Sequence, residues 1–248
     1  MSEDQTPDHE LVDAEQGLAF KLTKKQNNGI VYAAYWYAGL WAANGLCKIG
    51  VTPNAVSWLS LVFYMLSGVC FWQGSYLYGL LGAFLFLLGI GADATDGKMA
   101  RLTDNCSYMG IWLDSNIDSL RYLFIYPPIA FAVFRDTGAE WPLLVALIAV
   151  GLSLVGDTVS YAFKQFPFAK KAKESVSGTD NILHRILKQF YFTEGIEPLV
   201  ALAFAAADRL LWYIVLWAAL ITCRYFAIAI VWGRKVAEND RDRKTEAS

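Results

Sequence analysis

Runs of about 20 consecutive, mainly apolar residues are the feature that most constrains this chain, because that length crosses the hydrocarbon core of a bilayer as a helix. Of the 248 residues, 56% are hydrophobic and only 18% are charged, whereas about 25% of a soluble domain is charged. The sequence therefore predicts an all-α membrane protein with several spans. The net charge of −2 gives no indication of nucleic-acid binding.

Six transmembrane helices are expected, and the fifth is the shortest; they lie at about 54–73, 76–100, 109–134, 141–163, 193–208 and 210–233. The apolar segment 29–47 is rich in Tyr and Trp, which favour the membrane interface. We interpret it as an interfacial amphipathic helix that precedes the first span. The expected organisation is a polar tail (1–28), this helix (29–50), a six-helix domain (51–236) and a second polar tail (237–248).

The distribution of Lys and Arg outside the spans predicts the orientation. With six spans, one face of the membrane receives only Arg135 and Arg209, and the other receives all the remaining basic residues of the tails and links. The positive-inside rule makes the rich face cytoplasmic, together with both termini. The basic loop 164–192 then lies in the cytoplasm, where it either contacts anionic lipid headgroups or serves only as a topology signal.

Four carboxylates stand where the second and third spans face each other: Asp93, Asp96, Asp114 and Asp118. Each costs roughly 2.5–3.5 kcal/mol near the centre of a membrane helix. Spacings of three and four residues place each pair on one helical face, and a short link brings the pairs together. Oxygen ligands of this kind suit Mg²⁺ or Mn²⁺, so the sequence predicts a divalent metal site. Acids spread through several helices would instead favour an ion pathway.

Small residues and one arginine separate the two acidic pairs. Gly97 and Ala100 leave room for a ligand beside the carboxylates, and Arg101 offers a fixed positive charge to a phosphate. Gly110 allows the helices to pack closely. Each glycine taken alone is explained as well by ordinary helix packing.

The full pattern resembles the signature of the CDP-alcohol phosphotransferase family. It reads Asp93-x-x-Asp96-Gly97-x-x-Ala100-Arg101, eight residues, then Gly110-x-x-x-Asp114-x-x-x-Asp118. Six spans, a preceding interfacial helix and Thr52-Pro53-Asn54 at the start of the first span are also similar to this family.

The resemblance implies transfer of a substituted phosphate from a CDP-linked donor to an alcohol, with release of CMP. It implies two Mg²⁺ or Mn²⁺ ions on Asp93, Asp96 and Asp114, with Asp118 as a further ligand and the general base. It assigns the nucleotide to Asn54, Asp96, Gly97, Ala100, Arg101 and Gly110. It also implies a homodimer with its active site on the cytoplasmic side.

Two kinds of donor remain open. CDP-diacylglycerol would give a phosphatidyl group to a small polar alcohol, which the short chain favours, or CDP-choline or CDP-ethanolamine would give its headgroup to diacylglycerol or a related lipid alcohol. Glu194 and Glu197 begin the fifth span and Arg224 lies in the sixth; these three are the candidate acceptor contacts. A salt bridge with Arg224 or an ordinary helix-start preference explains the two acids equally. Asp157 is a further intramembrane acid, with Arg121 or Lys164 as its candidate partner.

Overall fold

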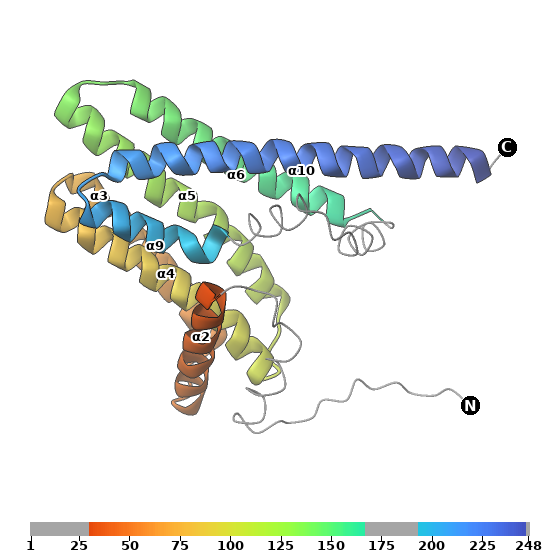
Figure 1. Cartoon of the computed structure of the whole chain (residues 1–248). Coiled ribbons are helices and arrows are strands. Elements are labelled where there is room, and N and C mark those ends of the chain that lie inside the picture. Colours follow the sequence, from red (N-terminus) through yellow and green to blue (C-terminus); the bar gives the residue numbers. More distant parts are fainter. Residues whose placement is uncertain (1–29, 167–192, 247–248) are drawn as a thin grey trace.

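The chain is described by a computed structural model for residues 30–166 and 193–246, and within those ranges it forms helices and no strands. In chain order (Figure 1), the helices are α2 (Ile30–Lys48), α3 (Pro53–Gln73), α4 (Tyr76–Leu102), α5 (Tyr108–Thr137), α6 (Trp141–Lys164), α9 (Thr193–Ala206) and α10 (Leu210–Glu246). The predicted all-α class is confirmed. The tail 1–28 and most of the loop 164–192 lie outside the described residues.

Five helices in the described ranges are long and apolar enough to cross a membrane, namely α3, α4, α5, α6 and α10. The expected span at 193–208 corresponds to α9, which is apolar but has only 14 residues. A membrane-crossing helix needs about 20 residues, so the sixth span stays a prediction. Beyond the predicted end of the last span at 233, α10 continues as a helix through the polar segment to Glu246.

Helix α3 is the element against which the site-bearing helices are packed. Both α4 and α5 contact α3 extensively, while α6 packs on α5 and α10, and α9 packs on α4. The core contains fully buried aromatic side chains from four of these helices, including Tyr64, Phe71, Phe86, Tyr126 and Tyr213. A Cβ atom at Gly68 would lie 2.7 Å from the carbonyl oxygen of Phe124. Only glycine therefore permits this close approach of α3 and α5.

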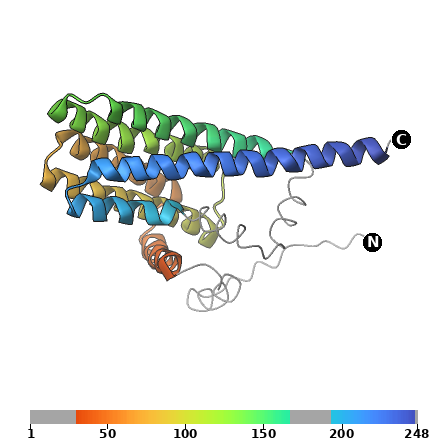
Figure 2. The same ribbon diagram turned by 45° about the horizontal axis from the view of Figure 1, so that its top comes forward.

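Helix α2 crosses the bundle at a steep angle and packs on α4 (Figures 1 and 2). This orientation agrees with a helix lying along the membrane surface. Its sequence is apolar almost throughout, and Trp41 is 82% exposed. The predicted amphipathic character is therefore not evident, and the interfacial placement remains a prediction.

Candidate functional site

The link between α4 and α5 reverses the chain within a few residues. At its start, Thr103 N–H bonds to the carbonyl of Met99, and Asp104 adopts a left-handed backbone with φ of 49°. At its end, Ser107 caps α5 by accepting a bond from the Gly110 N–H at 3.0 Å. Asp and Ser are residue types that favour such positions. The reversal brings the acidic ends of both helices to the same end of the bundle.

Three of the four predicted acids converge there and form what we call the carboxylate triad, Asp93, Asp96 and Asp114. One oxygen from each lies within 4.8 Å of the others. Asp96 is only 5% exposed, whereas Asp114 is exposed. Ligands around Mg²⁺ sit about 2.0–2.1 Å from the ion, so opposite ligands are about 4 Å apart. Oxygen donors gathered this closely fit a divalent cation. The three carboxylates alone do not distinguish one divalent cation from another.

Ser57 supports the triad from α3. Its hydroxyl donates to Asp96 Oδ2 at 2.5 Å, and its side chain is buried. Ser57 was not predicted from the sequence. Its position one turn after the Thr52-Pro53-Asn54 segment was the available signal, because residues three apart share a helical face.

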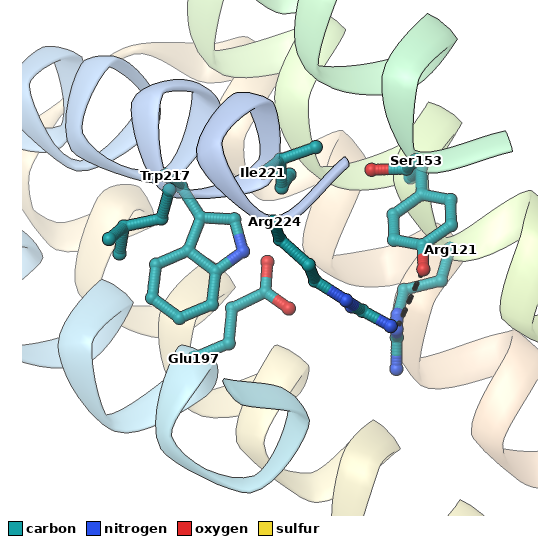
Figure 3. A pocket seen from close by; sticks show the side chains of 8 residues that line it. Arg121, Ser153, Glu197, Trp217, Ile221 and Arg224 are labelled. Atoms are coloured by element: carbon teal, nitrogen blue, oxygen red, sulfur yellow. Dashed lines mark hydrogen bonds between the residues drawn. The ribbon is translucent and has the colours of Figure 1, made fainter. Parts of the chain in front are cut away.

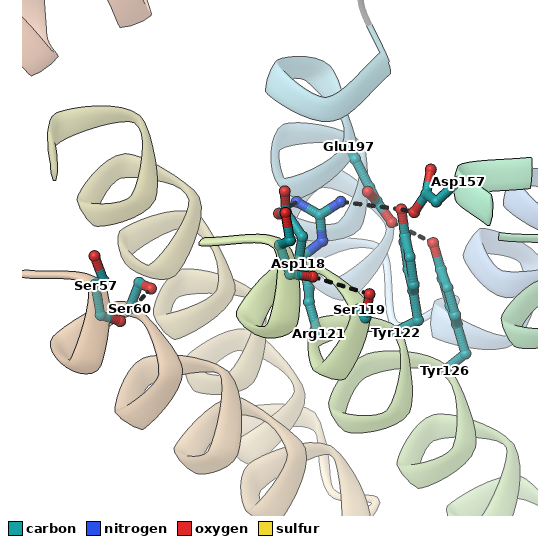
Figure 4. Close-up of polar contacts among 10 residues, drawn as sticks. Ser57, Ser60, Asp118, Ser119, Arg121, Tyr122, Tyr126, Asp157 and Glu197 are labelled. Carbon is teal, nitrogen blue, oxygen red and sulfur yellow. Dashed lines mark hydrogen bonds and ion pairs between the residues drawn. The ribbon is translucent and has the colours of Figure 1, made fainter. Parts of the chain in front are cut away.

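Asp118 lies one turn beyond Asp114 and has a different environment. Its Oδ1 is 3.5 Å from Nη1 of the buried Arg121, and its side chain is 36% exposed. It is therefore adjacent to the triad along α5, but it is ion-paired to a cation that faces deeper into the bundle (Figure 4).

Four of the residues assigned to the nucleotide form two close pairs in the structure. A Cβ at Gly110 would be 3.3 Å from Asn54 Oδ1, so the start of α3 meets the start of α5. A Cβ at Gly97 would be 3.5 Å from Arg101 Nη2, and Arg101 is exposed. Ala100 is half-buried on the same helix. The structure thus groups Asn54 with Gly110 and Arg101 with Gly97.

Deeper in the bundle, Glu197 of α9 is held by two tyrosines. Its Oε1 accepts from Tyr126 at 2.5 Å and from Tyr213 at 3.0 Å, and the residue is 3% exposed. We call Glu197, Tyr126 and Tyr213 the inner cluster. Sequence reasoning missed both tyrosines, although Asp114, Asp118, Tyr122 and Tyr126 recur every four residues along α5, which marks one polar face.

A pocket adjoins the inner cluster (Figure 3). Its polar lining includes Arg121, Ser153, Glu197 and Arg224, and Trp217 forms an apolar wall. The cavity volume is about 20 Å³, enough for a water molecule, so a larger ligand requires the side chains to separate. Of the predicted acceptor contacts, Glu197 and Arg224 come together here. The side chain of Glu194 lies outside the described part of the chain.

Asp157 on α6 also joins this region. Tyr122 donates to its Oδ2 at 3.1 Å. Of the two candidate partners, Arg121 reaches Asp157 through the Tyr122 hydroxyl, which accepts from Arg121 Nη2 at 3.5 Å. The side chain of Lys164 is outside the described residues.

Comparison with known proteins adds a family and several relatives. Residues 50–225 match the profile of the CDP-alcohol phosphatidyltransferase family. Cholinephosphotransferase 1 of Mus musculus is 32% identical over 125 residues, covering 47% of this chain and 30% of the relative. Phosphatidylinositol phosphate synthase of Cutibacterium acnes is 35% identical over 120 residues, covering 48% and 55%. Archaetidylinositol phosphate synthase of Pyrococcus horikoshii is 37% identical over 79 residues, covering 30% and 38%. The chain thus matches only part of the length of each relative.

Proposed function

The chain belongs to the CDP-alcohol phosphatidyltransferase family, and on that premise we propose that it is a membrane enzyme that transfers a substituted phosphate from a CDP-linked donor to an alcohol and releases CMP. The observation that carries the proposal is the convergence of Asp93, Asp96 and Asp114, with Asp118 one helical turn away. The cost of placing four acids in membrane helices is understandable if they form a working site.

In the proposed reaction, the acceptor hydroxyl oxygen bonds to the donor phosphorus farther from the cytidine. The bond between that phosphorus and the bridging oxygen breaks, CMP leaves with the electron pair, and Asp118 takes the hydroxyl proton. A positioned base of this kind contributes about 10²–10⁴-fold to a rate. Asp118 fits the role because its side chain is partly exposed and borders the buried polar region.

The carboxylate triad would hold Mg²⁺ or Mn²⁺, as a pair of ions with Asp118 as a further ligand. Bound there, the metal would neutralise the diphosphate and the charge on departing CMP. Arg101 would pair with a phosphate oxygen, and Asn54 would offer its amide to the nucleotide. Gly97, Ala100 and Gly110 would leave the space that the nucleotide fills.

For the acceptor, we infer a small polar alcohol, with CDP-diacylglycerol as the donor. The pocket that Arg121 borders is also lined by Arg224, Glu197 and Ser153, and charged and hydroxyl side chains of this kind offer hydrogen bonds to the hydroxyl groups of a small polar alcohol. The side chain of Glu194 belongs to the same proposal from the sequence alone.

The reverse arrangement, with CDP-choline or CDP-ethanolamine as donor and a lipid alcohol as acceptor, is supported by a specific observation. Several of the matched relatives carry the name cholinephosphotransferase. The Glu197 carboxylate and the Trp217 ring in one pocket are also a pair of groups that binds a quaternary ammonium.

We further infer that 51–236 is the catalytic unit, preceded by the interfacial helix 29–50 and flanked by the polar tails 1–28 and 237–248. The site and both termini would face the cytoplasm, because the basic residues gather at that side. A homodimer is expected from the family resemblance.

The experiment is metal-dependent CMP release by the purified protein. CDP-diacylglycerol is offered with a panel of soluble alcohols, and CDP-choline and CDP-ethanolamine are offered with diacylglycerol. Release with one pairing identifies the donor and the acceptor together. Absence of release with every pairing contradicts the proposed function.

Asp118→Asn provides the test of the base. We expect turnover to fall by about 10²–10⁴-fold, while the donor still raises the melting temperature of the variant, because a ligand that binds the folded state stabilises it. Turnover at the wild-type rate would remove Asp118 from the role of base.

A further inference from the structure

Arg121 is a charged side chain for which neither the motif nor the metal triad accounts. It lies on α5 three residues after Asp118 and is only 2% exposed. An ionised group buried within a helical bundle costs several kcal/mol unless charged or polar partners compensate it. Its partners therefore indicate why it is there.

The guanidinium group is shared between two directions. Nη1 faces Asp118 Oδ1 at 3.5 Å. Nη2 donates to the Tyr122 hydroxyl at 3.5 Å, and that hydroxyl donates to Asp157 on α6 at 3.1 Å. The guanidinium carbon also stands 5.1 Å from the centre of the Tyr122 ring. Arg121 thus connects Asp118 to an anchor on another helix (Figure 4).

The same side chain borders the pocket that contains Glu197 and Arg224 (Figure 3). Its Nε is buried and has no hydrogen-bond acceptor among the residues that the structure describes. Buried donors are rarely left unsatisfied in native proteins. The buried hydroxyl of Tyr64 on α3 lies near the same guanidinium group and likewise makes no hydrogen bond within the described residues.

We propose that Arg121 is a positioning residue for Asp118. Held by Tyr122 and Asp157, it fixes the orientation of the Asp118 carboxylate at the boundary between the triad and the acceptor pocket. The acceptor hydroxyl then meets a carboxylate that already points at it, and a rate depends steeply on such geometry. The inference rests on the proposed function of Asp118.

A simpler role would be neutralisation of Asp118 by any positive charge. Arg121→Lys separates the two roles, because lysine retains the charge but lacks the planar fork that reaches two partners at once. Tyr122→Phe removes only the hydroxyl that anchors the fork. Arg135→Lys is the matched control, because Arg135 lies near the opposite end of α5 and bonds to the carbonyls of Trp72 and Gln73.

For turnover, we expect Arg121→Lys to lower kcat by about 10–100-fold and Tyr122→Phe by a smaller factor, with the donor KM within about twofold of wild type, since misplacement of a reacting group costs on that scale. Arg135→Lys should leave kcat within about twofold. A kcat for Arg121→Lys equal to that of wild type overturns the proposal. If that variant does not fold, Tyr122→Phe decides in the same way.

A second measurement does not require turnover. We expect Arg121→Lys to change the Mn²⁺ dissociation constant, and we expect this change to disappear when Asp118 is already Asn, because Arg121 acts through Asp118. An unchanged constant, or equal fold-changes in both backgrounds, overturns the proposal. If the wild-type protein releases no CMP with any pairing, the proposed function is contradicted. The Mn²⁺ measurements on Arg121→Lys, with Asp118 and with Asn at position 118, still test the role of Arg121.

Discussion

Two sites that contain carboxylates lie along α5 and its neighbours, and the surroundings of their carboxylates differ. In the inner cluster, one carboxylate, Glu197, accepts hydrogen bonds from two tyrosines. In the carboxylate triad, three carboxylates converge within 4.8 Å, and Ser57 donates to one of them. Like charges at that separation repel one another strongly.

The comparison shows that the carboxylate of the inner cluster is stabilised by side chains of the protein itself. Two hydroxyl donors from α5 and α10 satisfy the Glu197 oxygen that they share, and they tie three helices together. The triad concentrates negative charge that a divalent cation would neutralise. We therefore expect the inner cluster to contribute mainly to stability and to the acceptor pocket, and the triad mainly to metal binding.

The largest expected effect is at the triad. Asp96→Asn retains the size of the side chain but removes a charge, so we expect Mn²⁺ binding to weaken greatly and CMP release to fall to background. Chelation of the metal should have the same effect on the wild type, reversed by added Mg²⁺. Binding is measured by titration and release by a coupled assay.

Glu197→Gln is the counterpart in the inner cluster. We expect this variant to bind Mn²⁺ as tightly as the wild type. If its activity falls, we expect the cause to be a higher KM for the acceptor. Metal-independent turnover by Asp96→Asn, or loss of Mn²⁺ binding in Glu197→Gln, would contradict the division between the two groups.

A smaller effect is expected from Ser57→Ala. The Ser57 hydroxyl orients a predicted metal ligand, and loss of such a contact weakens metal affinity by about 10–100-fold. Ser60→Ala is the matched control, because Ser60 is buried on the same helix and its hydroxyl donates to the Ser57 carbonyl at 2.7 Å rather than to a carboxylate. Equal Mn²⁺ affinities for the two variants would show that Ser57 has no part in the metal site.

The sequence was most informative where spacing alone determines proximity. The sequence predicted that the two acidic pairs, Asp93 with Asp96 and Asp114 with Asp118, would each lie on one helical face, because residues three or four apart share a face. A short link that reverses the chain was expected to bring the pairs together. The long apolar helices followed from length in the same way. Partners contributed by distant helices, such as Ser57 to Asp96 and Tyr213 to Glu197, depend on how the helices pack, which periodicity does not determine.

Asp157 shows the same limit in another form. The sequence offered charged partners for it, but the structure places a tyrosine hydroxyl between Arg121 and Asp157. Charge complementarity in a sequence therefore overlooked a neutral side chain that does the connecting. The span expected at 193–208 was the shortest in the sequence, and the structure gives it the helix α9 of 14 residues, fewer than a span usually needs.

The smallest expected effect is at the inner cluster. Tyr213→Phe removes one of two hydrogen bonds to Glu197, and a bond to a charged group contributes about 1.5–3 kcal/mol. The retained Tyr126 bond places our expectation at the lower end, about 1.5 kcal/mol, or roughly 3–6 °C in melting temperature for a chain of this size. Tyr76→Phe is the control, because the Tyr76 hydroxyl donates a long, exposed hydrogen bond of 3.4 Å to the carbonyl of Ala206. Mn²⁺ affinity should be unchanged in both variants. If Tyr213→Phe and Tyr76→Phe have the same melting temperature, the hydrogen bond from Tyr213 to Glu197 does not stabilise the fold. The proposed structural role of the inner cluster would then be contradicted.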